Sequence, residues 1–310
     1  MKTSMNKPLL LAAASLLLTA SASTFAASQA SKIGPQVCWL EMSAAKLDSA
    51  MGGAGISGTP VWDSTISSVL VRHAKGDVLI DTGFSPNAEA QMNELPDAGR
   101  DFGLQVVSGA KDRKSIVDAL STVGEKSSSV ARILITHAHY DHLGGAVELA
   151  VPIYVTSAES DWMAQQAAHP TITPPSLLAA IQLRVKSLDY KSGPYLGFES
   201  SDDIYGDGTI ITVPLPGHTP GSQGVFLKLA QRSVFLIGDA TDMLEAAVRG
   251  LPKNSAIRAN TDSEPELADA TAKRLSEFHQ AHPEISLVPA HDRTAYVAAF
   301  GRASTCISAF

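Results

Sequence analysis

The chain has few cysteines. Cys38 and Cys306 are the two among 310 residues, and they lie near opposite ends of the sequence. Two cysteines this far apart do not make a cysteine-type zinc site, so a metal centre would have to use histidine and carboxylate ligands. In an oxidising compartment the pair could form one disulfide that joins the ends of the mature chain, and two buried free thiols are the alternative.

Positive charge is also scarce. The chain has 24 Lys and Arg against 31 Asp and Glu, which gives a formal net charge of -7 at pH 7. An acidic chain argues against nucleic acid or an anionic lipid surface as a partner. The sequence also lacks low-complexity segments, short-period repeats, a glycine-rich phosphate loop and a Ser–His–Asp elbow motif.

Long hydrophobic runs are absent except near the N-terminus. Leu9 to Ala20 is apolar, follows Lys2 and Lys7, and precedes several small residues. The run is too short to span a bilayer, so the pattern predicts a signal peptide over residues 1–26, with a retained membrane anchor as the alternative. Its removal takes away two lysines and no acids, which changes the formal charge from -7 to -9. We expect a periplasmic or secreted mature protein that has no contact with the membrane.

The rest of the sequence alternates between β-rich runs and segments with helical periodicity. Strands are predicted over residues 65–73, 77–81, 132–136, 151–156, 209–215, 224–229, 233–239 and 285–290. Helices are predicted over residues 113–123, from Leu143 onward, over 161–168 and over 264–280. Residues 27–310 suffice for one large domain with an insertion at about 169–205. This alternation predicts a layered α/β sandwich.

Histidine and aspartate are concentrated where the strand at 132–136 ends. The stretch "THAHYDHLGG" contains His137, His139, Asp141 and His142. An extended backbone directs His137 and His139 to the same side, and the turn that follows lets the other two side chains reach back. A catalytic zinc ion uses three protein ligands, so four such groups indicate two neighbouring metals. An exposed polar loop is the alternative.

Three later strands also end in a candidate ligand. His218 lies in "PLPGHTPGS", Asp239 in "FLIGDAT" and His291 in "LVPAHD". A carboxylate at a buried strand end is costly to ionise without a cation nearby, so Asp239 is expected to have one. The other histidines lie in no ligand-like context and are expected at the surface or in packing: His73, His169, His279 and His282. Of these, His169 would be the exception if the insertion faces the site.

The order of these motifs, with "DTG" at residues 81–83 upstream, resembles the metallo-β-lactamase superfamily. The resemblance implies an αββα four-layer sandwich with two metal ions at the strand ends, most simply two Zn²⁺, with other divalent metals as alternatives. It implies that one ion is held by His137, His139 and His218. The other ion would be held by Asp141, His142 and His291, and Asp239 would bridge both. Asp81 would orient a ligand histidine through a hydrogen bond.

The resemblance implies a hydrolase. Two zinc ions that share a water would generate a bridging hydroxide near neutral pH, which attacks a carbonyl or phosphoryl centre. Asp141 is expected to handle a proton as the tetrahedral intermediate collapses, besides binding metal. A binding protein without chemistry would be expected to lack one or more of the seven ligands. Iron redox chemistry is a further alternative, but no flavin domain follows in this sequence.

The expected substrate is a lactone or an ester. The motif string is similar to that of acyl-homoserine lactonases, whereas β-lactamases of the family usually lack a carboxylate at the position of Asp239. Export favours a β-lactamase instead, and an organophosphate triester is the other alternative. The lactonases commonly carry a tyrosine where this chain has Asp242, which leaves the group that stabilises the oxyanion unidentified. The tyrosines that could replace it are Tyr140, Tyr190, Tyr195 and Tyr205.

Apolar side chains near the expected site predict a hydrophobic substrate pocket. The candidates are Trp39, Met42, Met51, Trp62, Trp162, Met163, Leu177 and Leu178. Ordinary core packing is the alternative for each of them. Together they favour a small-molecule substrate that is an apolar ester or lactone of medium size.

Overall fold

The computed structural model describes Met1, residues 35–56 and residues 61–309. The predicted signal peptide over residues 1–26 lies, after Met1, outside the described residues. Among the described helices, none has the length and hydrophobicity needed to cross a membrane.

The described strands form two sheets. The larger has the order β12-β1-β2-β3-β4-β5-β6, and the smaller has the order β11-β10-β9-β8-β7. The strands of the larger sheet are β1 (Gln36–Leu47), β2 (Trp62–Arg72), β3 (Asp77–Ile80), β4 (Val130–Leu134), β5 (Ile153–Thr156), β6 (Val185–Leu188) and β12 (Thr305–Ser308). Those of the smaller sheet are β7 (Asp202–Asp203), β8 (Ile210–Pro214), β9 (Gln223–Lys228), β10 (Ser233–Leu236) and β11 (Ser286–Val288).

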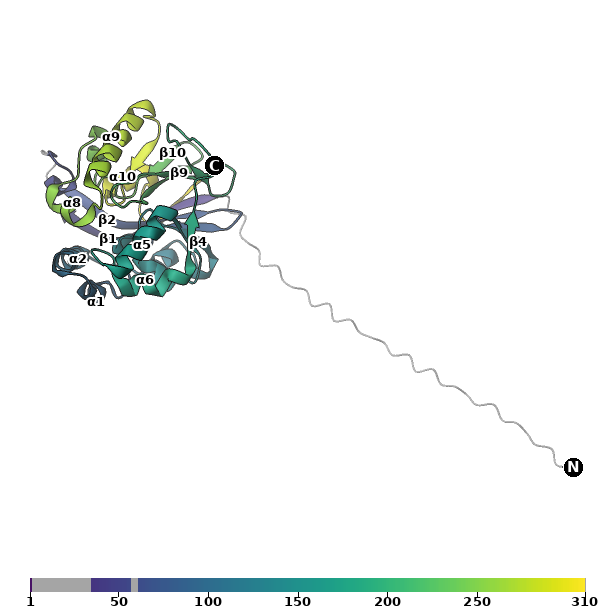
Figure 1. The fold of residues 1–310 in the computed structure, drawn as a ribbon. Coiled ribbons are helices and arrows are strands. Elements are labelled where there is room, and N and C mark those ends of the chain that lie inside the picture. The colour runs from purple at the N-terminus through teal and green to yellow at the C-terminus, as the bar shows by residue number, and fades with distance from the viewer. Residues whose placement is uncertain (2–34, 57–60, 310) are drawn as a thin grey trace. The chain divides into compact units, whose positions relative to one another are not determined.

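Helices cover the outer faces of both sheets, as Figure 1 shows for α1, α2, α5 and α6 on one side of the strands and α9 on the other. The first group and its neighbours are α1 (Ala88–Gln91), α2 (Asp97–Gly109), α3 (Ile116–Thr122), α4 (Tyr140–Leu143), α5 (Ser157–Ala168) and α6 (Pro175–Ile181). The second half of the chain adds α7 (Leu244–Arg249), α8 (Ser255–Thr261), α9 (Pro265–Ala281) and α10 (Arg293–Phe300).

Three layers of hydrophobic core separate these four layers of structure. The first joins the larger sheet to its helices through residues such as Leu120 and Met163. The second lies between the sheets and includes Trp39, and the third packs α9 onto the smaller sheet through Leu275 and Phe278. The αββα four-layer sandwich is therefore confirmed.

Strand direction brings several loops to one edge of the sandwich. β3, β4, β5 and β6 are parallel, so their C-terminal ends lie at the same edge of the larger sheet. In the smaller sheet β8 and β10 both pair antiparallel with β9, and β11 is parallel to β10. The loops after β8, β10 and β11 therefore also share an edge, which is where α/β folds commonly place their ligands.

The structure corrects one predicted segment and defines another. The α-helix expected from Leu143 onward instead ends there, and a 3-10 helix follows over Gly144–Glu148. The chain packs tightly at this point, since a Cβ on Gly145 would lie 2.2 Å from the Thr82 carbonyl oxygen. The segment at 169–205 contains α6 and supplies an edge strand to each sheet, β6 and β7.

The two cysteines are bonded to each other. Cys38 on β1 and Cys306 on β12 are direct partners in the antiparallel register, with their Cα atoms 4.0 Å apart. Of the two alternatives, the disulfide is therefore the one that the structure contains. It fixes the C-terminal edge strand β12 to its neighbour β1.

We predict that replacing both cysteines by alanine lowers the free energy of unfolding by about 2–5 kcal/mol, because the bridge constrains the unfolded chain. Thermal unfolding of the variant and of the untreated protein checks this, and the reduced wild-type protein serves as the control. Equal melting temperatures for all three samples would contradict it.

Candidate metal centre

Seven ionisable side chains meet at the shared edge of the two sheets. They come from the loop after β4, from α4, and from the loops after β8, β10 and β11. The sequence separates them by up to 154 positions, from residue 137 to residue 291. They are His137, His139, Asp141, His142, His218, Asp239 and His291, of which all except Asp141 and His291 are buried.

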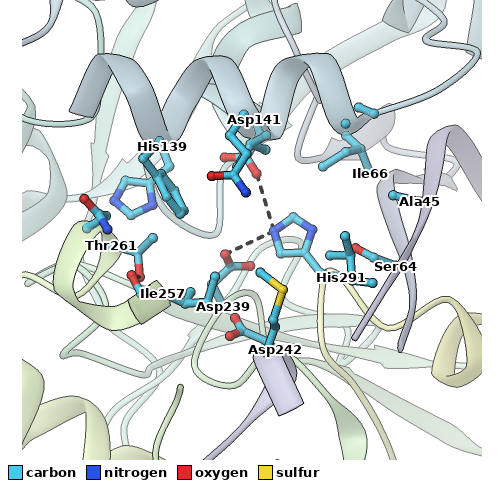
Figure 2. A pocket seen from close by; sticks show the side chains of 18 of the residues that line it. Ala45, Ser64, Ile66, His139, Asp141, Asp239, Asp242, Ile257, Thr261 and His291 are labelled. Atoms are coloured by element: carbon cyan, nitrogen blue, oxygen red, sulfur yellow. Dashed lines mark hydrogen bonds and ion pairs between the residues drawn. The ribbon is translucent and has the colours of Figure 1, made fainter. Parts of the chain in front are cut away.

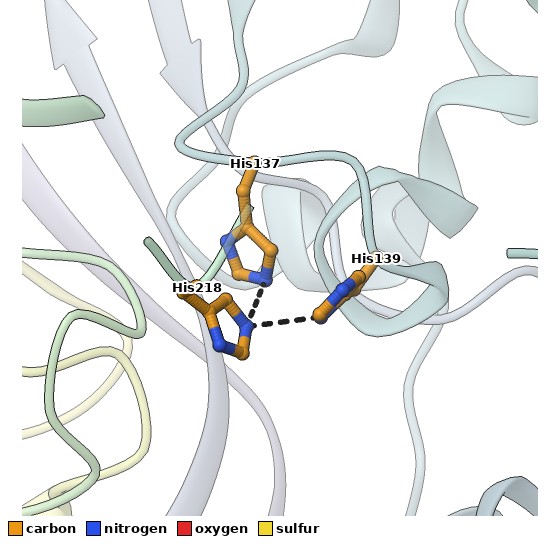
Figure 3. A group of neighbouring side chains, drawn as sticks. All are labelled: His137, His139 and His218. Atoms are coloured by element: carbon orange, nitrogen blue, oxygen red, sulfur yellow. Dashed lines mark hydrogen bonds between the residues drawn. The ribbon is translucent and has the colours of Figure 1, made fainter. Parts of the chain in front are cut away.

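Three imidazoles converge on one point, and we call His137, His139 and His218 the first trio (Figure 3). The Nε2 atom of His218 lies 3.1 Å from Nε2 of His137 and 3.0 Å from Nδ1 of His139. A single ring N–H can donate to only one of these two nitrogens. Ligands at 2.0–2.1 Å in a tetrahedral arrangement are about 3.3 Å apart, so this spacing fits three nitrogens around one zinc-sized cation.

A second group, Asp141, His142 and His291, is called the second trio here. The Nε2 atoms of the two histidines are 3.3 Å apart. The Asp141 Oδ2 atom lies 3.4 Å from His291 Nε2 and 3.9 Å from His142 Nε2. Figure 2 shows His291 between the carboxylates of Asp141 and Asp239, with each ion pair drawn as a dashed line. The mixture of imidazole and carboxylate also suits zinc and other divalent metals.

Asp239 lies between the two trios. Its Oδ2 atom is 3.5 Å from His218 Nε2 and 3.1 Å from His291 Nε2, and its Oδ1 atom is 3.3 Å from His142 Nε2. The residue is only 8% exposed. One buried carboxylate therefore faces the ligand atoms of both groups, which is the arrangement needed for two ions to share a ligand.

The far nitrogen of four of the five histidines lies close to a partner that orients the ring. These contacts join His142 Nδ1 to Asp81, His218 Nδ1 to Asp262, His291 Nδ1 to the Thr65 carbonyl, and His137 Nδ1 to the Thr136 hydroxyl. In each case the Nε2 atom is left to face the centre. Imidazoles held in this way are presented to a metal without the entropy loss of freely rotating side chains.

Asp81 occupies the position that the "DTG" motif predicts for it. Its carboxylate accepts hydrogen bonds of 2.8 Å from the backbone N–H and from the hydroxyl of Thr136, and one of 2.9 Å from His142 Nδ1. Its φ angle of 56° lies in the left-handed region, which aspartate and asparagine tolerate better than most residues. The residue thus connects the end of β3 to the loop after β4.

The two trios differ in electrostatics. Burial lowers the pKa of all three imidazoles of the first trio, so they are neutral, which is the form that binds metal. Burial also acts to lower the pKa of His142 and His291, but Asp239 and the other nearby carboxylates outweigh it. The pKa of His291 is raised to about 9. The second trio therefore has to release protons before it can hold a cation.

Sequence reasoning missed a buried lysine behind His218. The Lys253 ammonium lies 3.3 Å from the Asp262 carboxylate and 3.5 Å from that of Asp242, and all three side chains are buried. It also lies 2.7 Å from His218 Nδ1, but that nitrogen cannot accept from Lys253 while it donates to Asp262. Burial raises the pKa of Asp242 to about 6, although Lys253 opposes this. A lysine and aspartates in loops carry no sequence signal that distinguishes them from solvated residues.

A cavity of about 490 Å³ opens beside the seven side chains and is lined by apolar residues of α2 and α8. Met51 and Trp62 line it as predicted, and so does Tyr140. The other candidates take the alternative role, because their side chains fill the hydrophobic core: Trp39, Met42, Trp162, Met163, Leu177 and Leu178. The remaining candidate tyrosines do not line this cavity: Tyr190, Tyr195 and Tyr205.

The four other histidines take surface or packing positions. His73 stacks on Tyr205, and His282 packs against Phe278. His169 is exposed at the end of α5 and His279 is half-buried on α9, and neither lines the cavity. The prediction for these four is consistent with the structure.

Comparison with known proteins gives one family and several relatives. The pattern of the metallo-β-lactamase superfamily matches residues 61–291. A protein of Mycobacterium tuberculosis named probable metallo-hydrolase is 29% identical over 249 residues, with 74% of each chain covered. An N-acyl homoserine lactonase of Bacillus thuringiensis is 26% identical, with 77% of this chain and 84% of the lactonase covered. A solved N-acyl homoserine lactone hydrolase, with N-hexanoyl-L-homoserine at its catalytic metal centre, has a TM-score of 0.63 at 22% identity and covers 85% of this chain and 95% of its own.

We predict that Asp81→Asn weakens metal binding at the second trio by about 10–100-fold. An asparagine keeps the acceptor for the Thr136 N–H, but its amide N–H group would face the N–H of His142 and turn the ring. Competition against a chelator of known affinity measures the change. Asp77→Asn, at the opposite end of β3, is the matched control and should leave the affinity unaltered. Equal affinities for Asp81→Asn and wild type would contradict the prediction.

Proposed function

Since the chain belongs to the metallo-β-lactamase superfamily and is a metal-dependent hydrolase, we propose that it cleaves an apolar lactone or ester, such as an acyl-homoserine lactone, at a centre of two zinc ions. The observation that carries the proposal is the position of Asp239, whose carboxylate faces both trios. A site for a single ion would not require a buried carboxylate in contact with both groups.

The proposed ligands follow the geometry of the two trios. His137, His139 and His218 would hold one ion, and the second trio would hold the other, with Asp239 shared between them. The nitrogen and oxygen donors match those that zinc prefers, and other divalent metals could use the same set. When bound, the ions would lower the pKa of a water molecule towards about 7 and polarise the substrate carbonyl.

Protein groups would supply the remaining chemistry. Asp141 lines the cavity and is half-buried, so its carboxylate can reach a substrate as well as a metal. We assign it the transfer of a proton as the tetrahedral intermediate collapses. Tyr140 also lines the cavity, and burial raises the pKa of its hydroxyl well above the ordinary value, which keeps the O–H group as a hydrogen-bond donor.

The shape of the cavity favours a substrate with a hydrophobic part. α2 contributes Phe102 and Val106 to its wall, and α8 contributes Ile257. Burying such a chain gains about 0.8 kcal/mol for each CH₂ group removed from water. The similarity to N-acyl homoserine lactonases also supports a substrate with a hydrophobic part over a small polar one. The acidic chain and this lining give no support to nucleic acid as a substrate.

We also propose that the protein acts in the periplasm or outside the cell, as a mature domain over residues 27–310. The N-terminal pattern of two lysines and an apolar run supports export. The disulfide between Cys38 and Cys306 is an independent support, because such bonds persist mainly in oxidising compartments.

A hydrolysis panel tests the proposed activity. The zinc-loaded mature protein is assayed with butanoyl- and decanoyl-homoserine lactones, an aryl ester, a cephalosporin and an aryl phosphotriester. We expect the highest kcat/KM for the decanoyl lactone or the ester. The Asp239→Asn protein should lose at least 100-fold, since the shared ligand is weakened while the fold is retained, as circular dichroism would show.

Other rankings would change the conclusion. If the cephalosporin is the preferred substrate, the protein is a β-lactamase, and preference for the phosphotriester makes it an organophosphate hydrolase. If Asp239→Asn retains full activity on the lactone, the proposed centre is wrong.

A further inference from the structure

A buried carboxylate on α5 joins the two loops that carry the first trio. Glu159 is 1% exposed. Its Oε1 atom accepts a hydrogen bond of 2.5 Å from the backbone N–H of Ala138, which lies between His137 and His139. Its Oε2 atom accepts from the Thr219 hydroxyl at 2.6 Å and from the Gly221 N–H at 3.1 Å. All three donors belong to the two loops.

The local sequence suggests a different partner for this side chain. Thr156 and Glu159 have the spacing of a capping box, in which the glutamate would bond back to the N–H of the threonine. The threonine does cap the helix, since its Oγ1 atom accepts from the Glu159 N–H at 3.1 Å. The glutamate carboxylate, however, extends to the loops. The Thr156 hydroxyl also donates to the Gly221 carbonyl at 2.8 Å, so both residues of the box hold the His218 loop.

Close packing shows that the His218 loop lies directly on the first turn of α5. A Cβ atom on Gly221 would lie 2.1 Å from the Glu159 nitrogen and 2.4 Å from the Thr156 hydroxyl oxygen. Only glycine leaves room for this close contact between the loop and α5. The loop before α4 is fixed on its other side as well, because the Thr173 hydroxyl donates to the Ala138 carbonyl at 2.8 Å.

We infer that Glu159 is a positioning residue that sets the spacing of His137, His139 and His218, and thereby the metal affinity of the first trio. The inference rests on the proposed metal centre. Among the described residues no ion pair involves Glu159, and the three hydrogen bonds that its carboxylate accepts all come from the two loops. Loss of the side chain therefore releases both loops together, and loss of the charge alone removes the hydrogen bond from the Ala138 loop.

Among the hydrogen bonds of the described residues, none joins Glu159 to the second trio. His142 is held by Asp81, which follows β3, and His291 by the Thr65 carbonyl of β2, whereas α5 packs against β5 and β6. The inference therefore predicts a selective effect. A residue that only stabilised the fold would affect both groups of ligands alike.

The test measures the metal affinity of each trio separately. Zinc dissociation constants are obtained by chelator competition in two backgrounds, His291→Ala, which retains the first trio, and His218→Ala, which retains the second. Glu159→Gln is added to each. The amide can keep its oxygen towards Thr219 and Gly221, but its N–H group would then face the N–H of Ala138.

We expect Glu159→Gln to weaken zinc binding by about 10–100-fold at the first trio and less than twofold at the second. Cobalt(II) absorption bands of the His291→Ala protein should change in the same variant. Glu125→Gln is the matched control, because it also removes a carboxylate, here from an ion pair with Arg72. It should alter neither affinity. Thr219→Val, which removes one of the three donors and keeps the shape, should produce a smaller loss at the first trio.

The inference is overturned if Glu159→Gln leaves the affinity of the first trio unchanged. It is equally overturned if both trios weaken by the same factor, since Glu159 would then serve the fold as a whole. If Glu159→Gln does not fold, as judged by metal-free thermal unfolding, the Thr219→Val protein decides between these outcomes by the same comparison. The test does not depend on the proposed substrate. If the wild-type protein binds zinc at both trios but cleaves no lactone or ester, the proposed activity is wrong, and the effect of Glu159→Gln on the two zinc affinities can still be measured.

Discussion

The structure depends on the cost of burying ionisable groups next to one another. Five imidazoles and two carboxylates share a small volume at the edge of two sheets, and most of them are shielded from water. Removing such groups from water is unfavourable unless each has a partner of suitable charge or hydrogen-bonding character. Cations at the two trios would satisfy this condition for the inner atoms. Hydrogen bonds from the surrounding loops satisfy the same condition for the outer atoms of these side chains. The groups that make these hydrogen bonds come from widely separated strands.

The hydrogen bonds that orient the histidine rings come from many parts of the fold, so a small site depends on a large domain. Asp81 follows β3, Asp262 follows α8 and Thr65 lies within β2, yet each orients one ring of the centre. Glu159 acts on the loops and not on the rings. α8 contributes both to the cavity wall and, through Asp262, to the support of His218, so the substrate pocket and the metal ligands share an element.

That the seven candidate ligands lie close together could be predicted from sequence, because they follow strands with simple hydrophobic patterns and four of them are closely spaced between His137 and His142. β1 could not be recognised in this way, since it is buried on both faces and a bulge between Glu41 and Ser43 interrupts its register. α2 was missed because it contains three glycines, which disfavour helix; at one of them, Gly103, a Cβ would lie 2.3 Å from the Met92 sulfur. In the sequence, buried loop residues such as Lys253 cannot be distinguished from residues exposed to solvent.

Large apolar residues such as Trp162 are equally compatible with a pocket wall and with the hydrophobic core until the packing is known.

The central claim is that seven side chains hold two metal ions that share Asp239. Anomalous diffraction at the zinc edge from crystals of the zinc-loaded protein tests it most directly. The account predicts two peaks, one within reach of His137, His139 and His218 and one within reach of Asp141, His142 and His291, with Asp239 in contact with both. A single peak, or two peaks of which only one contacts Asp239, would contradict it.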